Sequence, residues 1–509
     1  MSKYLFYAFP VLVAFLIGES RSDAEDSSRP NIVLIMCDDM GWSDIGCYGG
    51  EVETPNLDRM AAEGMRFTQF YNCAKCTTTR ASIVTGLHPR RKGGLLTREM
   101  VTTGEVLATA GYQTSLSGKW HLGSKADTHP FHRGFQQYYG LLDGCCNFFD
   151  PSIPDPAYKG GKVREFGRND ERITEFPKDF YTTDAFTDHA IAQIRTATEK
   201  QQPFFAHVCY TAPHYPIHAK PQDIEKYIGR FKMGWEEMRK QRYQRQIAMG
   251  LIDAETWSLS THDSKAYAWE GADHEFEDRR MAVYAAMIDS MDQNIGRLMQ
   301  TLKDTGVDDN TVVFFLSDNG GCSEEPGGRN PEERNPGPKD DYVAVGPSWG
   351  WAQNTPFKRY KTWAHEGGIC TPMIARWPVS IQPNVITAQP AHIIDFMATF
   401  VDLAETEYPA NFGSNDIIPL EGKSIVPILR GEVRKPHDTL AWEYTGNRAV
   451  RQGDWKLVWD KTVKEWELYD LGRDRCETVD LASQNPERVK AMSADWFAWA
   501  KKTDAPGGK

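Results

Sequence analysis

One short segment combines residue types that can attack and bind an anionic group. Cys76 is followed by three threonines and then by Arg80. The residues after them favour a helix that begins near Cys76. A helix N-terminus offers unpaired N–H groups and the positive end of the helix dipole, which favour an anion, and arginine adds planar donors suited to oxyanions. We therefore predict a small-anion pocket with a reactive side chain at Cys76.

Two apolar segments, typical of buried strands, end in oxygen-bearing side chains. These side chains belong to Asp38, Asp39, Asp318 and Asn319. Ligands collect at the carboxyl ends of parallel strands, where several carboxylates repel each other unless a cation lies between them. Oxygen ligands without imidazole favour Ca²⁺ or Mg²⁺ over a transition metal. The alternative is that the aspartates are turn residues that cap a strand, although two separate strands share the ending.

Three further segments contribute basic residues and histidines. Lys119 and His121 are two residues apart, so in an extended segment both would face the same way and could form an anion pocket with a proton carrier. A solvated basic turn is the alternative. His214 lies in a proline-rich segment and could instead be structural. Lys361 precedes the pair Gly367-Gly368, which permits close backbone approach. A basic surface strand would explain Lys361 but not the glycines.

The elements that must position these residues follow an α/β pattern. Apolar, β-rich runs occupy residues 32–36, 203–208 and 311–316, and residues 284–302 have helical spacing. Continuous apolar strands that alternate with helices predict a large mixed, mostly parallel sheet sandwiched by helices. Residues 324–348 are rich in glycine, proline and charge, and predict a long surface loop near the site.

The last part of the chain has a different character. From residue 436 onward, short aromatic-rich strands are separated by turn residues, and residues 485–501 read as a helix. This pattern predicts a small C-terminal antiparallel sheet plus a helix, packed beside the main domain. We therefore expect a catalytic domain at residues 30–435 and a C-terminal subdomain at 436–509.

Composition argues against nucleic acid binding, and the N-terminal residues indicate export. The chain has 509 residues and a net charge of −12, so no basic surplus supports nucleic acid binding. Residues 1–20 resemble a signal peptide, followed by a polar lead-in at 21–29. An uncleaved anchor is the alternative. We expect an exported protein, periplasmic or secreted, that has no membrane segment after signal cleavage.

The ten cysteines are too dispersed to form a disulfide scaffold. Cys73 and Cys76 have the spacing of a redox motif or of half a zinc site. A zinc site would need a second matching pair, and Cys145 and Cys146 are adjacent. A thioredoxin-like motif would need a compact context that this sequence lacks.

Together these motifs resemble those of the type I sulfatases of the alkaline phosphatase superfamily, and most closely those of bacterial arylsulfatases. The resemblance covers nearly the whole chain after the N-terminal segment, and the motifs occur in the family's order. They are Asp38-Asp39, Cys76 to Arg80, Gly118 to His121, Ala212 to His214, Ser317 to Gly320, Tyr360-Lys361 with Glu366 to Gly368, Asn447 to Arg451 and Glu467 to Leu471.

The resemblance implies a mechanism and a partner. A formylglycine-generating maturation enzyme would convert Cys76 to formylglycine (3-oxoalanine), whose hydrate would attack sulfur in a small-molecule or glycan sulfate ester. One Ca²⁺, with Mg²⁺ as an alternative, would be held by Asp38, Asp39, Asp318, Asn319 and the modified Cys76. The sulfuryl oxygens would be neutralised by Arg80, Lys119, His121 and Lys361. His214 with Lys361 would protonate the departing alcohol or phenol, Asp318 would help to activate the nucleophile, and His121 would help to expel sulfate.

One position departs from the family pattern. Thr78 stands where the usual signature has proline, a position that maturation enzymes read. If Cys76 stays a thiol, the protein would be a non-catalytic binder of sulfated glycans. A phosphodiesterase or phosphonate monoester hydrolase of the same superfamily is the other alternative. Such relatives carry histidine where this chain has Asn319, and that difference favours calcium and sulfate.

Overall fold

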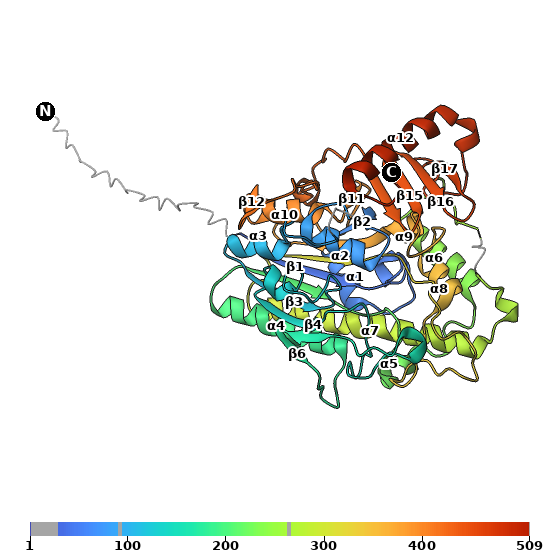
Figure 1. The fold of residues 1–509 in the computed structure, drawn as a ribbon, viewed down its shortest axis with the longest axis horizontal. Coiled ribbons are helices and arrows are strands. Elements are labelled where there is room, and N and C mark those ends of the chain that lie inside the picture. The colour runs from blue at the N-terminus through green and yellow to red at the C-terminus, as the bar shows by residue number, and fades with distance from the viewer. Residues whose placement is uncertain (2–28, 90–93, 262–265, 508–509) are drawn as a thin grey trace.

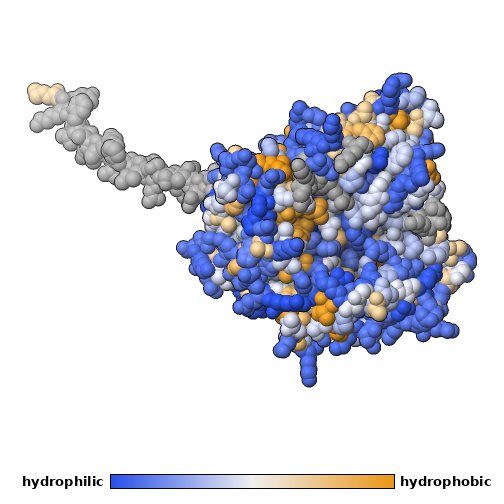
Figure 2. Space-filling model, viewed as in Figure 1, coloured by the Kyte–Doolittle hydropathy of each residue, from blue (hydrophilic) through white to orange (hydrophobic). Residues whose placement is uncertain are grey.

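The computed structural model describes residue 1 and residues 29–89, 94–261 and 266–507. The expected signal peptide and lead-in therefore lie outside the described residues, except for Met1 and Arg29. Among the described residues, every helix is too short or too polar to span a membrane. On the face seen in Figure 2, the surface is mainly hydrophilic, with apolar side chains in small patches.

A mixed sheet of eleven strands forms the centre of the main domain. The strand order is β10-β2-β9-β8-β1-β7-β3-β4-β5-β6, and β11 pairs with β2. The strands are β1 (Asn31–Cys37), β2 (Met65–Tyr71), β3 (Gln113–Gly118), β4 (Gln137–Leu141), β5 (Phe166–Arg168), β6 (Glu171–Ile173), β7 (Phe204–Cys209), β8 (Thr311–Ser317), β9 (Cys370–Arg376), β10 (Val385–Thr387) and β11 (Ala391–His392). The four central strands β8, β1, β7 and β3 are mutually parallel.

Helices cover both faces of this sheet (Figure 1). Along β1, Val33 and Ile35 belong to the core shared with α1, α4 and α7, while Ile32 and Leu34 belong to the core shared with α2, α3 and α10. The helices are α1 (Pro55–Ala62), α2 (Cys76–Thr85), α3 (Thr103–Thr109), α4 (Thr182–Glu199), α5 (Pro221–Glu225), α6 (Trp235–Ala248), α7 (His274–Asp304), α8 (Gly346–Gln353), α9 (Glu366–Ile369), α10 (Asp395–Leu403), α11 (Val426–Leu429) and α12 (Pro486–Thr503). This alternation explains why the strand is continuously apolar.

A second sheet, antiparallel and four-stranded, lies beside the main domain. Its strands are β14 (Leu440–Tyr444), β15 (Asn447–Gln452), β16 (Trp455–Asp460) and β17 (Glu465–Asp470). Side chains such as Leu457 pack on α12, and alternate side chains such as Val458 join the main core. Two short strands, β12 (Asn411–Phe412) and β13 (Asn415–Asp416), form a separate hairpin.

The predicted fold class is confirmed: a mixed, mostly parallel α/β sandwich with a small C-terminal antiparallel sheet and a helix. Two elements differ in extent from the prediction. The helix predicted at 284–302 extends over His274–Asp304, because the Asp273 side chain caps it at the amide of Phe276. The predicted loop at 324–348 ends earlier, since α8 begins at Gly346.

Candidate active site

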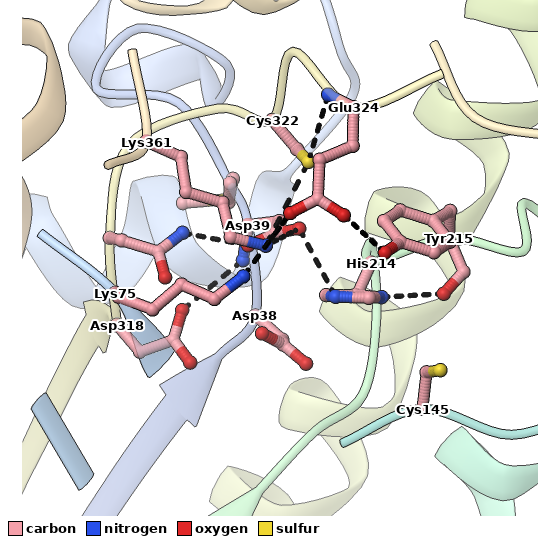
Figure 3. Close-up of polar contacts among 12 residues, drawn as sticks. Asp38, Asp39, Lys75, Cys145, His214, Tyr215, Asp318, Cys322, Glu324 and Lys361 are labelled. Atoms are coloured by element: carbon pink, nitrogen blue, oxygen red, sulfur yellow. Dashed lines mark hydrogen bonds and ion pairs between the residues drawn. The ribbon is translucent and has the colours of Figure 1, made fainter. Parts of the chain in front are cut away.

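The carboxyl ends of neighbouring strands bring the acidic residues together. Because β1 and β8 run parallel in register up to Cys37 and Ser317, Asp38 and Asp318 emerge side by side. The amide of Asp39 donates to Asp318 Oδ1 at 3.3 Å, and Asn319 Nδ2 donates to Asp39 Oδ1 at 2.7 Å. All five predicted ligand residues are buried, and the fifth, Cys76, is described below. The four carboxylate and amide ligands are Asp38, Asp39, Asp318 and Asn319, and Figure 3 labels the three aspartates.

Cys76 is the first residue of α2, as the sequence predicts. Candidate ligand atoms of Cys76, Asp38 and Asp318 lie within 4.8 Å of one another. One turn along the helix, the Arg80 guanidinium donates to Asp318 Oδ2 at 2.9 Å and to the Lys119 carbonyl at 2.8 Å. Burial lowers the pKa of Arg80, but the Asp318 and Asp38 carboxylates outweigh it and raise this pKa. Arg80 is therefore a fixed cation beside the Cys76 side chain.

Thr78, the residue that departs from the family pattern, stabilises the start of the helix. Its hydroxyl group lies 2.7 Å from the Cys73 carbonyl and 2.9 Å from the Lys75 carbonyl. In addition, the Cys73 amide donates to Thr79 Oγ1 at 2.9 Å. These bonds fix the turn that places Cys76 at the helix N-terminus without a side-chain cap from Lys75.

Lys119 and His121 follow β3, which lies next to β7 in the sheet. Lys119 Nζ contacts Asp38 Oδ2 at 2.5 Å. The backbone here is not extended as predicted, because His121 has a φ of 60°. Burial and the cations Lys119 and Arg80 hold the pKa of His121 well below its usual value. His121 is therefore neutral and lies close to the cationic side of the site.

Lys361 approaches from a loop that precedes β9. Its ammonium group lies 2.7 Å from Asp39 Oδ2, and both side chains are buried. Burial lowers the pKa of Lys361, but Asp39 outweighs it and holds this pKa well above the usual value. Gly367 and Gly368 allow the close backbone approach that the sequence predicts. A Cβ at Gly367 would lie 2.4 Å from the Arg359 carbonyl, and one at Gly368 would lie 2.1 Å from the Trp363 carbonyl.

His214 lies in the loop after β7. Its Nδ1 is 2.5 Å from the Tyr215 carbonyl, and because a carbonyl only accepts, Nδ1 must carry the proton. The other ring nitrogen, Nε2, lies 3.4 Å from Asp39 Oδ2. Burial lowers the pKa of His214 to about 4. The histidine therefore presents Nε2 to the carboxylate and to the interior of the site.

The acidic residues fit a hard divalent cation. Asp38 Oδ1 and Asn319 Oδ1 are buried oxygens without a hydrogen-bond partner among the described residues. Burial and the nearby Asp318 carboxylate raise the pKa of Asp38, so its charge is not fully compensated. Oxygens left unpaired in the interior are costly unless a cation or a donor meets them. An all-oxygen donor set of this kind suits Ca²⁺ or Mg²⁺.

Two charged residues at this site were not identified from the sequence. Glu324, in the loop after β8, lies 3.2 Å from Lys75 Nζ and 3.6 Å from Lys361 Nζ, and accepts a hydrogen bond from the Tyr215 hydroxyl (Figure 3). Lys75 directly precedes Cys76, which is the only sequence signal that could have identified it. Tyr215 contributes its hydroxyl group rather than a stacking surface, since its ring is buried against His214.

We do not assign a metal ion to a second cluster of possible metal ligands. His365, Asp460 and Glu467 lie together at the contact with the small sheet. However, Arg359 Nη2 binds Asp460 at 2.8 Å, and Lys358 Nζ lies 3.4 Å from Glu467. These cations already balance the carboxylates, so we interpret the cluster as a structural ion-pair network.

The fold is an alkaline-phosphatase-like α/β sandwich, with Cys76 at a helix N-terminus and an acidic cluster at the sheet edge. Comparisons with known proteins are more specific. Residues 30–406 match the sulfatase family model, and residues 357–494 match the model for the N-sulphoglucosamine sulphohydrolase C-terminal region. The chain belongs to the sulfatase family of the alkaline phosphatase superfamily and is a sulfuric ester hydrolase by that membership.

Individual relatives agree with the family but differ in specificity. The arylsulfatase of Klebsiella aerogenes is 33% identical over 81% of this chain and 94% of its own. The N-acetylgalactosamine-6-sulfatase of Rattus norvegicus is 30% identical over 88% of this chain and 74% of its own. The crystal structure of Ps i-CgsB has a TM-score of 0.69 at 25% identity and covers 94% of each chain. Because these names differ, the arylsulfatase subtype remains a prediction.

Proposed function

We propose that this protein hydrolyses sulfate monoesters with a formylglycine made from Cys76 and one bound Ca²⁺. The observation that carries the proposal is the position of Cys76. Its side chain lies at the N-terminus of α2, within 4.8 Å of carboxylate oxygens of Asp38 and Asp318. The cation Arg80 is bound to the same Asp318 carboxylate. An acidic cluster next to fixed cations suits a metal ion and an anionic substrate together.

The ion would be held by Asp38, Asp39, Asp318 and Asn319, two of which present unpaired buried oxygens. When bound, Ca²⁺ would supply electrostatic stabilisation of the sulfuryl group and lower the pKa of the attacking hydroxyl group of the formylglycine hydrate. Mg²⁺ has the same preference for oxygen ligands and is an alternative. The chain's own residues would do the remaining work.

The cations of the site would bind and orient the sulfuryl group. Arg80 is fixed by Asp318 and by the Lys119 carbonyl, so it needs no rearrangement to meet negative charge. The ammonium groups of Lys119 and Lys361 are held by Asp38 and Asp39. Donors fixed in this way stabilise charge that develops in the transition state. His121 is neutral and could accept a proton when sulfate leaves.

The departing alcohol or phenol needs a proton. Lys361 and His214 both meet Asp39, one at 2.7 Å and the other at 3.4 Å. We assign the proton transfer to this pair: the Lys361 ammonium group carries the proton, and Nε2 of His214, which has none while the ring is neutral, faces the site and can relay it. Asp39 would then hold both groups in position, which explains why a carboxylate is buried between them.

We further propose that the chain is exported, as residues 1–20 indicate, and that a formylglycine-generating enzyme is its maturation partner. The expected substrates are small-molecule or glycan sulfate esters. Relatives named for aryl sulfates and for N-acetylgalactosamine sulfate support both leaving-group classes. Mature protein should turn over 4-nitrophenyl sulfate, and a chelator should stop the reaction.

Mass spectrometry of the tryptic peptide 76–80 tests the nucleophile directly. Conversion of cysteine to formylglycine removes the sulfur and two hydrogens and adds one oxygen, so the peptide mass must fall accordingly. An intact thiol in a catalytically active preparation would refute the proposal. An intact thiol in a preparation that binds sulfated glycans without turnover would instead support the binder.

A further inference from the structure

A second polar cluster lies beside the buried anion pocket, and we name it the outer cluster. It consists of Lys75, Lys159, Tyr215 and Glu324. Glu324 Oε1 lies 3.2 Å from Lys75 Nζ, and its second oxygen accepts from the Tyr215 hydroxyl. Lys159 Nζ lies 3.4 Å from the same hydroxyl oxygen and 5.2 Å from the centre of the Tyr215 ring. Lys75 and Tyr215 thus contact the Glu324 carboxylate directly, and Lys159 is joined to it through the Tyr215 hydroxyl group.

The outer cluster lies between the anion pocket and solvent. The side chains of Lys361 and Asp39 are each 1% exposed, whereas those of Lys75 and Glu324 are 18% and 36% exposed. Glu324 also lies 3.6 Å from Lys361 Nζ, which joins the two clusters. Because the pocket opens to solvent on the side of Glu324, we place the alcohol part of a sulfate ester bound at Cys76 there.

The chemistry of Glu324 limits what can bind beside it. Lys361 and Lys75 outweigh the effect of burial and hold the pKa of Glu324 at about 2, so it is ionised. An ionised carboxylate only accepts hydrogen bonds, and its two oxygens offer more acceptor sites than Tyr215 and the lysines use. A neutral hydroxyl group can donate to it, whereas a second anion in direct contact with this carboxylate would be repelled, although Lys75 and Lys159 lie nearby.

We propose that Glu324 is a specificity-determining residue that selects esters with an uncharged, hydroxyl-bearing alcohol part and rejects those with another anion beside the scissile sulfate. This inference rests on the proposed function, because it assigns the leaving-group side of the same site. It favours sulfated neutral sugars over sugars with a carboxylate or a second sulfate at that position. The repulsion between Glu324 and an anion and the hydrogen bond from a hydroxyl group to Glu324 would both contribute to this specificity.

Three aryl sulfates can isolate the effect. They are 4-nitrophenyl sulfate and two derivatives with a substituent ortho to the sulfate, either hydroxymethyl or carboxylate. The measurement is kcat/KM for each ester with the wild-type protein and with Glu324→Gln. Intrinsic differences in leaving-group reactivity cancel when the hydroxymethyl/carboxylate ratio is compared between the two proteins.

A matched control is available at the next residue. Glu325 lies 3.0 Å from Arg280, and the structure pairs it with Tyr267 rather than with the outer cluster. Glu325→Gln should keep the hydroxymethyl/carboxylate ratio within about twofold of wild type, as expected for a charge that does not face the substrate. Tyr215→Phe removes one donor to Glu324 but keeps its charge and frees an acceptor site, so it should not reduce the ratio as Glu324→Gln does.

The wild type should prefer the hydroxymethyl ester, and Glu324→Gln should reduce the ratio by about tenfold or more. A hydroxymethyl/carboxylate ratio in Glu324→Gln within about twofold of wild type overturns the inference. If the wild type hydrolyses 4-nitrophenyl sulfate, the proposed function stands even when the Glu324 inference fails. If none of the three esters is hydrolysed by protein with converted Cys76, the proposed function fails, and this inference fails with it.

Discussion

Replacement of Lys361 by methionine is a demanding test of the proposed anion pocket. The ammonium group is buried and lies 2.7 Å from Asp39 Oδ2. Methionine keeps most of the side-chain volume but removes the charge and all three donors. Loss of one fixed donor that stabilises transition-state charge typically lowers kcat by about 10²- to 10³-fold. We expect a decrease of that size with 4-nitrophenyl sulfate, measured as initial rates at saturating substrate.

The same substitution should lower stability. Removing one partner of a buried ion pair costs about 3–5 kcal/mol, because the other charge is left uncompensated. Asp39 would keep the hydrogen bond that Asn319 Nδ2 donates at 2.7 Å. We therefore expect a loss of about 3 kcal/mol in the free energy of unfolding, at the lower end of that range. Urea titration followed by tryptophan fluorescence measures it.

Lys358→Met provides the control on the same loop. Lys358 Nζ lies 2.7 Å from the Tyr469 hydroxyl and 3.4 Å from Glu467, in a half-buried position at the small sheet. Its loss should leave kcat within about twofold and cost at most about 1 kcal/mol, as for other partly exposed pairs. A Lys361→Met protein that folds and keeps kcat within about tenfold of wild type would refute the assigned role, because one lost donor should cost more.

Three further predictions concern metal, pH and maturation. Ca²⁺ should raise the melting temperature of the wild type, and Asn319→Ala, which removes an unpaired buried oxygen, should reduce both this shift and the Ca²⁺ affinity in calorimetry. Burial raises the pKa of Glu366, but the cations around it lower it from 4.5 to about 2, so its stabilisation is complete above pH 4.5 and is lost as pH falls towards 2. The stability advantage of wild type over Glu366→Gln should therefore shrink by about 3 kcal/mol across this range in urea titrations, and a constant difference would contradict the assignment. Thr78→Pro restores the family signature and should raise the converted fraction of Cys76 when the protein is produced with a maturation enzyme, as read by peptide mass. An unchanged fraction would show that this position does not limit conversion.

The sequence was sufficient to place the acidic cluster because its signal is local. A continuous apolar run predicts a buried strand, and the aspartate that follows it predicts which end of the strand binds a ligand. Two such strands, β1 and β8, proved to be neighbours in parallel register, so Asp38 and Asp318 meet at one edge. The helix that begins at Cys76 was also predictable from the residues that follow it.

The strand order was not predictable from these patterns. Lys119 and His214 meet the aspartates because β7 lies between β1 and β3, and nothing in either motif specifies that neighbour. His121 also departs from the extended conformation that a period of two assumes, with a φ of 60°. Glu324 was predicted only as part of a loop near the site, because a single charged residue in a glycine-rich loop acquires a role only from the lysines that reach it in space.

The small C-terminal sheet has a physical connection to the site through the loop that carries Lys361. Asn447 Nδ2 donates to the Thr362 carbonyl at 2.9 Å, immediately after Lys361. At the end of the same loop, Glu366 is buried and lies 2.6 Å from Lys456 Nζ, with Arg475 on its other oxygen. Contacts from the second sheet thus hold this loop after Lys361, and the contact of Lys358 with Glu467 holds it before Lys361.

A loop that carries a buried cation needs this support, because an ammonium group in the interior is stable only if its position against the carboxylate is fixed. The main sheet supplies Asp39, and the small sheet holds the backbone that carries its partner. Loss of the Glu366 ion pairs should therefore weaken the geometry of Lys361 as well as global stability. On this view the C-terminal sheet is part of the machinery that orients the anion pocket, since positioning errors of about 1 Å can cost about 10²-fold in rate.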